Sequence, residues 1–526
     1  MTDSLPANAA QTQRTLVNAL AATLREHYGE LAHIETHISH ILLAGAQAWK
    51  IKKPVNFGFL DFTTLKKRRH YCEEELRLNR RLAPSLYEAV EPITGPLDAP
   101  QIGGEGEALD YAVRMRRFPD SAQLDRQLAA GGLPLELMDR IAEKIARFHH
   151  DAEPAPADSR FGTPDTVYAP MAQNFEQIGA MLPDESERAR LNRLEHWTAT
   201  RFDALRPLLA QRKADGHIRA CHGDMHLANM ALLDGELIIF DGIEFNEDFR
   251  LIDTLNDLAF LVMDLDDRGL TAHARRLLNS YIEHSGDHAG LPLLDFYTVY
   301  RALVRAKVAL FELGNPTLDL PAREAILARY RRYARLAERI IDTERRPSLC
   351  LTLGVSGSGK SVIAEKLVEA LGALRLRSDV ERQRLFGREE KSGGLETGIY
   401  TPEATEATYA RLRELTQTLL AAGFPVVVDA TFLKAAQRAP FTALADERRC
   451  PWLILDIDCD TATLEARVRA RRDEGRDPSQ ADSDVLHHQL ATREALDDTE
   501  RRHRYPLRCD ALPDGQVAGI VELLGR

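Results

Sequence analysis

The chain has 526 residues, of which 44% are hydrophobic and 28% are charged, and its formal net charge is −12. This length exceeds what one hydrophobic core supports and predicts two domains, while the composition is that of an ordinary globular protein. The acidic balance argues against binding of extended nucleic-acid tracts, which need a basic face, and no apolar run has the length that a bilayer span requires.

The N-terminus and the cysteines indicate where the protein is located. Residues 1–13 carry no basic cluster ahead of an apolar run, so we expect no secretory signal and a cytoplasmic protein without membrane attachment. Six scattered cysteines without a C-x-x-C pair predict reduced thiols. Cys450 and Cys459 flank a predicted strand, and a bridge between them is the alternative.

The first 220 residues are predicted to mix strands with helices. A polar tail leads into a helix that ends near residue 30. The strands expected next are two within 33–53, with Gly45 in their turn, and one at 111–115. The expected helical segments are 65–82, 135–150 and 172–213, with an exposed Pro- and Ala-rich loop at 151–164.

The second half changes its pattern near residue 346. Residues 250–345 have helical spacing throughout, and Pro347 ends the last helix, so we place a domain boundary between 345 and 346. After it, short apolar strands alternate with helices, which is typical of a parallel sheet with helices on both faces. The strands are predicted at 349–354, 374–377, 425–429 and 452–458.

A kinase-type catalytic loop is indicated between residues 221 and 242. His222-Gly223-Asp224 is followed by Asn229, which gives the D-x-x-x-x-N spacing of a protein-kinase catalytic loop. Twelve residues after Asn229, a hydrophobic strand ends in Asp241-Gly242, where a kinase keeps a Mg²⁺-binding aspartate. The segment Asp253–Asp257 is expected to support this loop structurally.

These residues resemble the aminoglycoside-phosphotransferase and choline-kinase branch of the protein-kinase-like fold, over residues 30–340. The resemblance implies that Asp224 accepts the proton of the acceptor hydroxyl and that Asn229 and Asp241 hold Mg²⁺. The strand lysine that grips nucleotide falls on Lys50, and Lys52, on the same face of the strand, competes for that role.

The glutamate partner of that lysine is expected on the next helix. Glu75 is preferred, with Glu73 and Glu74 as rivals. No glycine-rich loop is recognisable upstream of Lys50. His222 and His226 have metal-pair spacing, but in a catalytic loop His222 is expected to fix the loop by packing, and the cluster of His33, His37 and His40 is expected to carry no metal.

A second nucleotide-binding motif lies at the start of the C-terminal part. Gly354-Val355-Ser356-Gly357-Ser358-Gly359-Lys360-Ser361 fits G-x-x-x-x-G-K-[ST] between a strand and a helix. Glycines let the loop curl so that its N–H groups face a phosphate at the positive end of the new helix. Lys360 is predicted to reach the β- and γ-phosphates, and Ser361 to hold Mg²⁺.

Three further segments resemble polynucleotide 5′-hydroxyl kinase, gluconate kinase and the zeta toxins, over residues 348–510. Asp379-x-x-Arg382 follows a strand, and Asp429-x-Thr431 ends another. The resemblance implies that Asp379 is the base for the acceptor hydroxyl, that Arg382 lies near the acceptor or transferring phosphate, and that Asp429 lies near Mg²⁺. Within the arginine cluster at 467–472, Arg471 or Arg472 would be the lid arginine.

The expected fold class is α/β and α+β. Residues 1–345 would form a protein-kinase-like (aminoglycoside phosphotransferase) domain, and residues 346–526 a P-loop kinase domain with a parallel sheet flanked by helices. Such a fusion resembles the bifunctional aminoglycoside phosphotransferase and ATP-binding proteins. The predicted cofactors are ATP and Mg²⁺, and the predicted partner is a small-molecule or nucleotide-like hydroxyl acceptor.

Two other functions stay open at this point. The kinase-like domain could sense nucleotide and regulate its neighbour without chemistry, although a pure binder has no need of the Asp224 base. The P-loop domain could be a toxin-like kinase acting on a nucleotide sugar or on a nucleic-acid 5′-hydroxyl. The sequence names neither acceptor.

Overall fold

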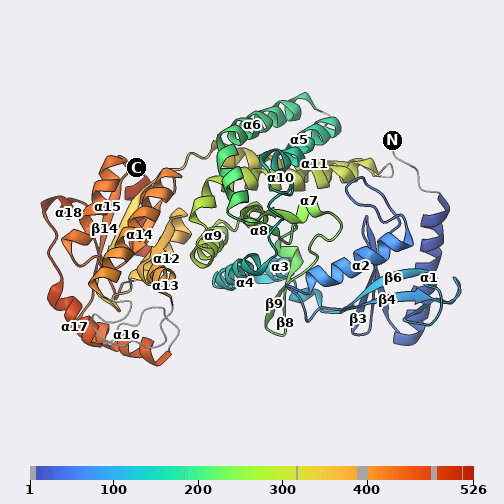
Figure 1. Cartoon of the computed structure of the whole chain (residues 1–526), viewed down its shortest axis with the longest axis horizontal. Helices are drawn as coiled ribbons and strands as arrows, with labels where there is room; N and C mark the ends of the chain where they lie inside the picture. Colours follow the sequence, from blue (N-terminus) through green and yellow to red (C-terminus); the bar gives the residue numbers. More distant parts are fainter. Residues whose placement is uncertain are drawn as a thin grey trace. The chain divides into compact units, whose positions relative to one another are not determined.

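The computed structural model describes residues 7–182, 184–315, 318–387, 401–474, 483–511 and 513–525. The backbone forms two compact units, each built from several stretches of chain (Figure 1). Unit 1 comprises Met1–Pro134, Arg147–Asp264 and Tyr300–Leu318. Unit 2 comprises Leu135–Ala146, Leu265–Val299 and Asp319–Arg526.

Unit 1 contains a six-stranded antiparallel sheet in the order β1-β2-β3-β6-β4-β5. Its strands are β1 (Leu31–Glu35), β2 (Ser39–Ala44), β3 (Gln47–Lys52), β4 (Tyr87–Thr94), β5 (Gln101–Ile102) and β6 (Asp110–Arg116). Helices α1 (Ala7–Tyr28) and α2 (Leu65–Asn79) pack on it. The predicted turn at Gly45 is confirmed, with a left-handed φ of 54°, but three strands replace the expected two within 31–52.

The remainder of unit 1 is largely helical. Its small strands pair as two antiparallel ribbons, β7 (Ile218–Ala220) with β10 (Leu251–Asp253) and β8 (Met230–Leu233) with β9 (Glu236–Ile239). Its helices are α3 (Leu124–Gly131), α5 (Pro164–Met181), α6 (Glu185–Ala214) and α7 (Glu247–Arg250). Three helices contribute residues to both units: α4 (Leu137–Asp151), α8 (Thr254–Asp267) and α10 (Leu294–Phe311). Short 3-10 turns lie at Asp120–Ala122, Leu227–Asn229, His288–Leu293 and Glu312–Gly314.

Unit 2 is built on a five-stranded parallel sheet in the order β12-β13-β11-β14-β15. The strands are β11 (Leu349–Leu353), β12 (Leu374–Arg377), β13 (Val426–Asp429), β14 (Trp452–Asp458) and β15 (Arg504–Arg508). The helices are α9 (Thr271–Ser285), α11 (Leu320–Asp342), α12 (Lys360–Leu371), α13 (Ser378–Phe386), α14 (Pro402–Ala421), α15 (Ala435–Glu447), α16 (Thr461–Glu474), α17 (Ser483–Thr492), α18 (Asp498–Arg502) and α19 (Pro513–Gly525).

The centre of this parallel sheet is apolar, as the sequence pattern predicts. Every residue of β11 is buried, as expected for a strand covered on both faces. Residues of α12 and α19 pack together with Cys350, Val427 and Leu455 in one core cluster. Strand β15 was not predicted, because Arg504-Tyr505-Pro506-Leu507-Arg508 has charged ends and a proline, which suit only an edge strand.

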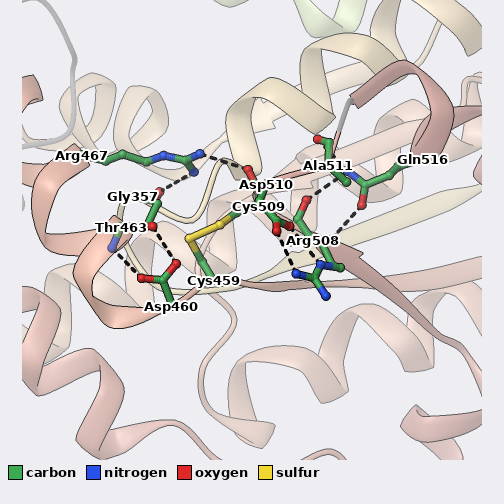
Figure 2. The surroundings of a disulfide bond; sticks show 10 residues. All are labelled: Gly357, Cys459, Asp460, Thr463, Arg467, Arg508, Cys509, Asp510, Ala511 and Gln516. Carbon is green, nitrogen blue, oxygen red and sulfur yellow. Dashed lines mark hydrogen bonds and ion pairs between the residues drawn. A yellow bond between two sulfur atoms is a disulfide. The ribbon is translucent and has the colours of Figure 1, made fainter.

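The expectation that all six cysteines are reduced is wrong for one pair. Cys459 and Cys509 form a disulfide with Cα atoms 5.3 Å apart (Figure 2), whereas Cys450 is a buried free thiol. The two sulfurs meet because β14 and β15 run parallel and end together, with Asp458 paired to Arg508. The cysteines are 50 residues apart in sequence, so their spacing carried no signal of this contact.

The predicted fold class is confirmed by these two architectures. An antiparallel sheet with a packed helix precedes a helical region in unit 1, and a parallel sheet flanked by helices forms the centre of unit 2. The boundary at residues 345 and 346 stays a prediction, and it falls between the end of α11 at Asp342 and the start of β11 at Leu349. None of the described helices is both long and apolar enough to cross a membrane.

Two candidate active sites

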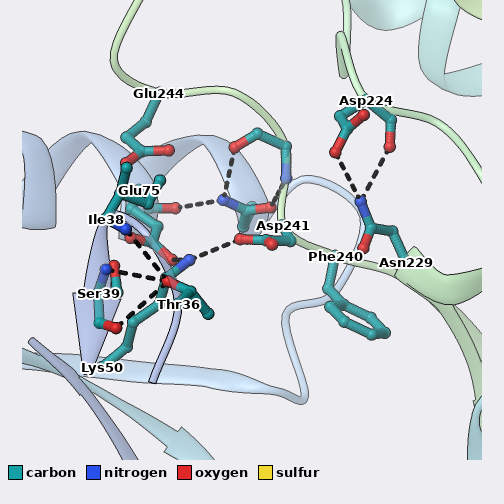
Figure 3. Close-up of polar contacts among 12 residues, drawn as sticks. Thr36, Ile38, Ser39, Lys50, Glu75, Asp224, Asn229, Phe240, Asp241 and Glu244 are labelled. Atoms are coloured by element: carbon teal, nitrogen blue, oxygen red, sulfur yellow. Dashed lines mark hydrogen bonds and ion pairs between the residues drawn. The ribbon is translucent and has the colours of Figure 1, made fainter. Parts of the chain in front are cut away.

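A network of two buried lysines, two buried glutamates and the half-exposed Asp241 lies at the sheet of unit 1. Figure 3 shows the part of it around Lys50, Glu75 and Asp241. Lys50 Nζ lies 2.8 Å from Glu75 Oε1 and 2.6 Å from Asp241 Oδ1. Lys52 Nζ lies 2.6 Å from Glu75 Oε2 and also pairs with Glu244. Lys50 and Lys52 are two residues apart on β3, so both side chains leave the same face and reach the one glutamate.

Burial and charge act against each other in this network. Burial would raise the pKa of Glu75, but Lys50 and Lys52 hold it down at about 2. Burial would lower the pKa of Lys50, but Asp241 and Glu75 raise it well above its ordinary value. Glu244 differs, because burial outweighs the attraction of Lys52 and raises its pKa. Both lysines are therefore charged, and Glu244 takes up a proton more readily than Glu75 does.

The structure separates Glu75 from its two sequence rivals. Glu75 is fully buried on α2, facing the lysines. Glu73 and Glu74 lie on the other side of the helix, where they pair with Arg69 at 2.9 Å and Arg77 at 2.6 Å. Thr64 caps the start of α2 by accepting a hydrogen bond from Lys67 N, as a cap residue does.

The predicted catalytic-loop residues come together next to this network. The Asn229 amide nitrogen donates to Asp224 O at 3.0 Å and to Asp224 Oδ2 at 3.2 Å (Figure 3). His226 Nε2 lies 3.4 Å from the same carboxylate oxygen. Burial would raise the pKa of Asp224, but the charge and hydrogen bond of His226 and the charge of Arg305 hold it well below its usual range. Asp224 is therefore an ionised acceptor.

Asp257 of α8 supports the catalytic loop at its start, as predicted for the segment Asp253–Asp257. Its two carboxylate oxygens accept from His222 N at 2.9 Å and from Gly223 N at 2.8 Å. His149 Nε2 lies 3.1 Å from Asp257 Oδ2. Burial would raise the pKa of Asp257, but the hydrogen bond and charge of His149 bring it to about 2. The aspartate thus orders the backbone that precedes Asp224.

Asp241 has a left-handed backbone with a φ of 63°, a conformation that a non-glycine residue adopts only when its surroundings impose it. Its N–H donates to the Tyr87 hydroxyl at 3.2 Å, and the next N–H, of Gly242, donates to Asn79 Oδ1 at 2.7 Å. These two bonds turn the Asp241 carboxylate toward Lys50.

The residues predicted to bind Mg²⁺ have the donor atoms that this ion prefers, oxygens of carboxylate and amide groups. Because the nitrogen of Asn229 donates to Asp224, its carbonyl oxygen faces the other way (Figure 3). The alternative of zinc on the loop histidines finds no support, since His222 Nε2 lies 3.0 Å from Phe240 O. His149, Cys221 and Asp257 also lie close enough to hold a metal, but Asp257 already accepts from the loop backbone.

The phosphate loop of unit 2 has the backbone that its motif requires. Gly357 and Gly359 have φ values of 83° and 96°, and α12 begins at Lys360 directly after them. A Cβ at Gly354 would fall 2.6 Å from Ser358 Oγ, so any larger residue there would displace the Ser358 side chain. Among the described residues, Ser358 Oγ is buried without a hydrogen-bond partner, which suits an atom facing a ligand.

Other residues of the loop are held by neighbouring elements. Lys360 Nζ donates to Val355 O at 2.8 Å, across the mouth of the loop. The Ser356 N–H donates to Gln489 Oε1 of α17 at 2.8 Å, a contact that sequence reasoning missed. Ser361 is exposed in the first turn of α12.

The predicted acceptor-side residues lie at the carboxyl ends of β12 and β13, the edge where ligands of parallel sheets bind. Asp379 and Arg382 lie on α13, directly after β12, and Asp429 ends β13. Burial raises the pKa of Asp379, against the charges of Arg382 and Arg377. A raised pKa suits a carboxylate that accepts a proton.

The surroundings of this site include a tyrosine that was not predicted, and they leave the predicted lid arginine undescribed. The hydroxyl of Tyr409 on α14, which sequence reasoning missed, lies within hydrogen-bond distance of Thr431 Oγ1, at 3.4 Å. Tyr409 also interacts electrostatically with Arg382 and Asp379. The side chain of Arg471, the predicted lid arginine, lies outside the described residues, as does that of Arg472. In the same cluster, Arg467 donates to Gly357 O at 3.3 Å and to Cys509 O at 3.0 Å (Figure 2).

Comparison with known families and proteins agrees with the P-loop assignment. Residues 349–496 match the family described as AAA domain. The uncharacterized proteins Rv2004c of Mycobacterium tuberculosis and Mb2027c of Mycobacterium bovis are each 31% identical to this chain over 446 residues. The alignments cover 83% of this chain and 85% of those proteins.

Solved structures of kinases are also similar to parts of the chain. A choline/ethanolamine kinase family protein from Mesorhizobium loti, 14% identical, covers 62% of this chain and 95% of its own, with a TM-score of 0.34. Amicoumacin kinase hAmiN, solved with AMP-PNP, Ca²⁺ and Ami, is 10% identical and covers 62% and 96%, with a TM-score of 0.40. A gluconokinase from Sinorhizobium meliloti, 21% identical, covers 34% and 95%, with a TM-score of 0.25.

Proposed function

We propose a function for this chain from its own sites, because the mycobacterial proteins of the family to which it belongs are uncharacterized. It aligns with them over 83% of its length. The protein is an ATP-dependent phosphotransferase of the cytoplasm with two kinase-type sites. Each site transfers the γ-phosphate to a hydroxyl of a small-molecule or nucleotide-like acceptor.

The convergence of residues in unit 1 carries this proposal. Lys50, Glu75, Asp224, Asn229 and Asp241 come from a strand, a helix and two loops, and hydrogen bonds or ion pairs join them in two groups side by side (Figure 3). Phosphoryl transfer needs positioning and neutralisation of phosphate charge more than covalent help, and these side chains supply both. A binding module would have no use for the ionised Asp224.

Each residue of the unit 1 site has a role in the proposal. Lys50, held by Glu75, binds the nucleotide phosphates. Asn229 and Asp241 hold Mg²⁺, which when bound neutralises phosphate charge. Asp224 accepts the proton of the acceptor hydroxyl, and its hydrogen bond from Asn229 orients the receiving oxygen.

The unit 2 site works on the same principle with different parts. The loop of Gly354, Ser356, Gly357, Ser358 and Gly359 surrounds the phosphates, with the Ser356 N–H already held by Gln489. Lys360 binds the β- and γ-phosphates, and Ser361 and Asp429 hold the Mg²⁺. Asp379 accepts the proton of the acceptor hydroxyl, Arg382 stabilises the transferring group, and Arg471 closes over it.

Transfer of label from [γ-³²P]ATP to a panel of sugars, aminoglycosides, nucleosides and 5′-hydroxyl oligonucleotides tests the proposal. The intact chain is compared with Asp224→Ala and Asp379→Ala. The matched controls are Asp234→Ala and Asp498→Ala, whose side chains are 71% and 92% exposed in surface ion pairs. We expect each site variant to lose at least 100-fold of the label on its own acceptor, roughly the contribution of a general base.

The pattern of losses separates the alternatives. If Asp224→Ala changes nothing and Asp379→Ala removes all transfer, unit 1 is a nucleotide sensor that regulates a P-loop kinase. If label appears only on 5′-hydroxyl oligonucleotides, the P-loop site is a nucleic-acid end kinase. If both variants transfer as well as the controls do, the proposed function is wrong.

A further inference from the structure

Helix α9 (Thr271–Ser285) is an integral part of the P-loop unit, although it lies outside the matched residues 349–496 and before the predicted domain boundary. Arg276 pairs with Glu365 at 2.5 Å and with Glu369 at 3.0 Å, both on α12, the helix that begins at the phosphate loop. Arg275 donates to the carbonyl of Ala370 near the end of that helix at 2.6 Å.

The same helix covers β12, an edge strand of the parallel sheet. The Arg375 N–H of that strand donates to Asn279 Oδ1 of α9 at 2.8 Å. An uncovered edge strand would leave such N–H groups unpaired, so α9 completes the sheet at this side. Strand β12 ends at Arg377 and leads directly into Asp379 on α13.

Glu283, in the last turn of α9, forms ion pairs with two arginines of strand β12. Its two carboxylate oxygens lie 3.0 Å from Arg375 and 3.0 Å from Arg377, and its side chain is 14% exposed. Its backbone carbonyl accepts from Arg384 of α13 at 2.6 Å. Burial would raise the pKa of Glu283, but the two arginines lower it, so the carboxylate is ionised.

Arg377 links Glu283 to the proposed acceptor site, since it pairs with Glu283 and is followed two residues later by Asp379. It pairs in register with Asp429, and its charge interacts with both Asp429 and Asp379. Arg375 lies two residues before Arg377 on the same face of β12, but it is not among the main charges that act on Asp379, which are Arg382, Arg377, Asp429 and Lys360. The two partners of Glu283 are therefore unequal with respect to the chemistry.

We propose that Glu283 is a positioning residue of the P-loop site, which holds the Arg377 guanidinium away from the carboxylates of Asp379 and Asp429. This proposal rests on the proposed phosphotransferase function of unit 2. Besides Glu283, the carboxylates whose charges act on Arg377 are those of Asp379 and Asp429, which the proposal reserves for the acceptor proton and for Mg²⁺. The functional P-loop module then includes α9, in addition to the residues after 346.

Steady-state kinetics of label transfer by the intact chain tests this role. Glu283→Gln is expected to lower kcat at the P-loop site by about 10- to 100-fold, as loss of an orienting partner does, while the KM for ATP changes less than about threefold. Arg375→Gln, which removes the other partner, is the matched control and is expected to keep kcat within about threefold. Glu283→Asp, which keeps the charge, is expected to recover part of the loss.

The double variant Glu283→Gln/Arg377→Gln distinguishes positioning from general support of the fold. If Glu283 acts by restraining Arg377, removing the Arg377 charge as well raises kcat above that of Glu283→Gln alone. If Glu283 only stabilises the fold, the double variant is no better than the single one and the proposal fails. It also fails if Glu283→Gln and Arg375→Gln are equally impaired.

A binding measurement keeps the test independent of any acceptor. Asp379→Ala shows whether the P-loop site transfers phosphate at all, so failure of the proposed function is recognised separately. The protein is titrated with Mg²⁺, ADP and aluminium fluoride together, and only the binding that Lys360→Met abolishes is assigned to the P-loop site. The affinity of that binding is expected to fall about tenfold in Glu283→Gln and to stay within about twofold in Arg375→Gln. Equal affinities in these two variants would refute the role of Glu283.

Discussion

The two lysines of β3 should respond oppositely to replacement by methionine, which keeps the length of the side chain and removes its charge. Lys52 is 1% exposed, and without it the buried Glu244 loses its lysine partner. Breaking a buried ion pair costs about 3–5 kcal/mol. The loss tends to the lower value here, because Glu244 already has a raised pKa and can take up a proton.

Replacement of Lys50 should cost less stability and more activity. Glu75 keeps its bond to Lys52, and the Asp241 side chain is 49% exposed, so water replaces its lost partner. An ion pair with such a solvent-exposed partner contributes about 1 kcal/mol. Lys50→Met should nevertheless abolish transfer at the unit 1 site, because Lys50 is the lysine that faces the proposed metal ligand.

Hydrogen exchange of the β3 and α2 amides, measured by mass spectrometry on the intact chain, reports these differences. Lys52→Met should exchange at least about 30-fold faster than Lys50→Met, which is the equivalent of a 2 kcal/mol difference. Lys52→Met/Glu244→Leu should recover at least half of the loss, since an apolar pair of similar volume can replace a buried ion pair. Equal exchange in the two single variants, or no recovery in the double variant, would refute the assignment.

Three further outcomes can be checked on the intact chain. The pKa of Asp257 is about 2 against an ordinary 3.8, so this group contributes about 2 kcal/mol to the free energy of unfolding above pH 4, and the contribution is lost as the pH falls toward 2. In urea unfolding, Asp257→Asn should lose this stability at neutral pH and should lose less stability than the unchanged protein on acidification. Thiol titration of the denatured protein should count four thiols with the Cys459–Cys509 bond formed and six after reduction, and reduction should cost at most about 4 kcal/mol. The acid limb of kcat/KM at the P-loop site should lie above the ordinary pKa of an aspartate and move upward in Arg382→Gln, because a cation that lowers the pKa of Asp379 is removed.

Local motifs predicted more of the P-loop unit than of its surroundings. The glycine spacing of residues 354–361 requires a tight strand–helix turn, and the left-handed Gly357 and Gly359 follow from it. The disulfide, by contrast, depends on β14 and β15 lying side by side across 50 residues of intervening chain. The same holds for α9: the helical pattern of α9 and the strand β12 were each predicted, but the contact between them was not.

The choice between Lys50 and Lys52 shows why a strand pattern cannot resolve such a site. Alternation puts both side chains on one face, and both do reach Glu75, so neither their position on the strand nor their charge distinguishes them. What distinguishes them is a second carboxylate for each lysine, and both carboxylates come from one short loop, Asp241 and Glu244.

That loop owes its shape to contacts distant in sequence. The left-handed backbone of Asp241 is fixed by the Tyr87 hydroxyl, and the next N–H is fixed by Asn79. Such bonds turn Asp241 toward Lys50 and place Glu244, three residues on, within reach of Lys52. A site of this kind follows from the strand, the helix and the loop together, so the sequence predicted the partner of Lys50 on the helix, Glu75, but not the loop carboxylates that pair with the two lysines.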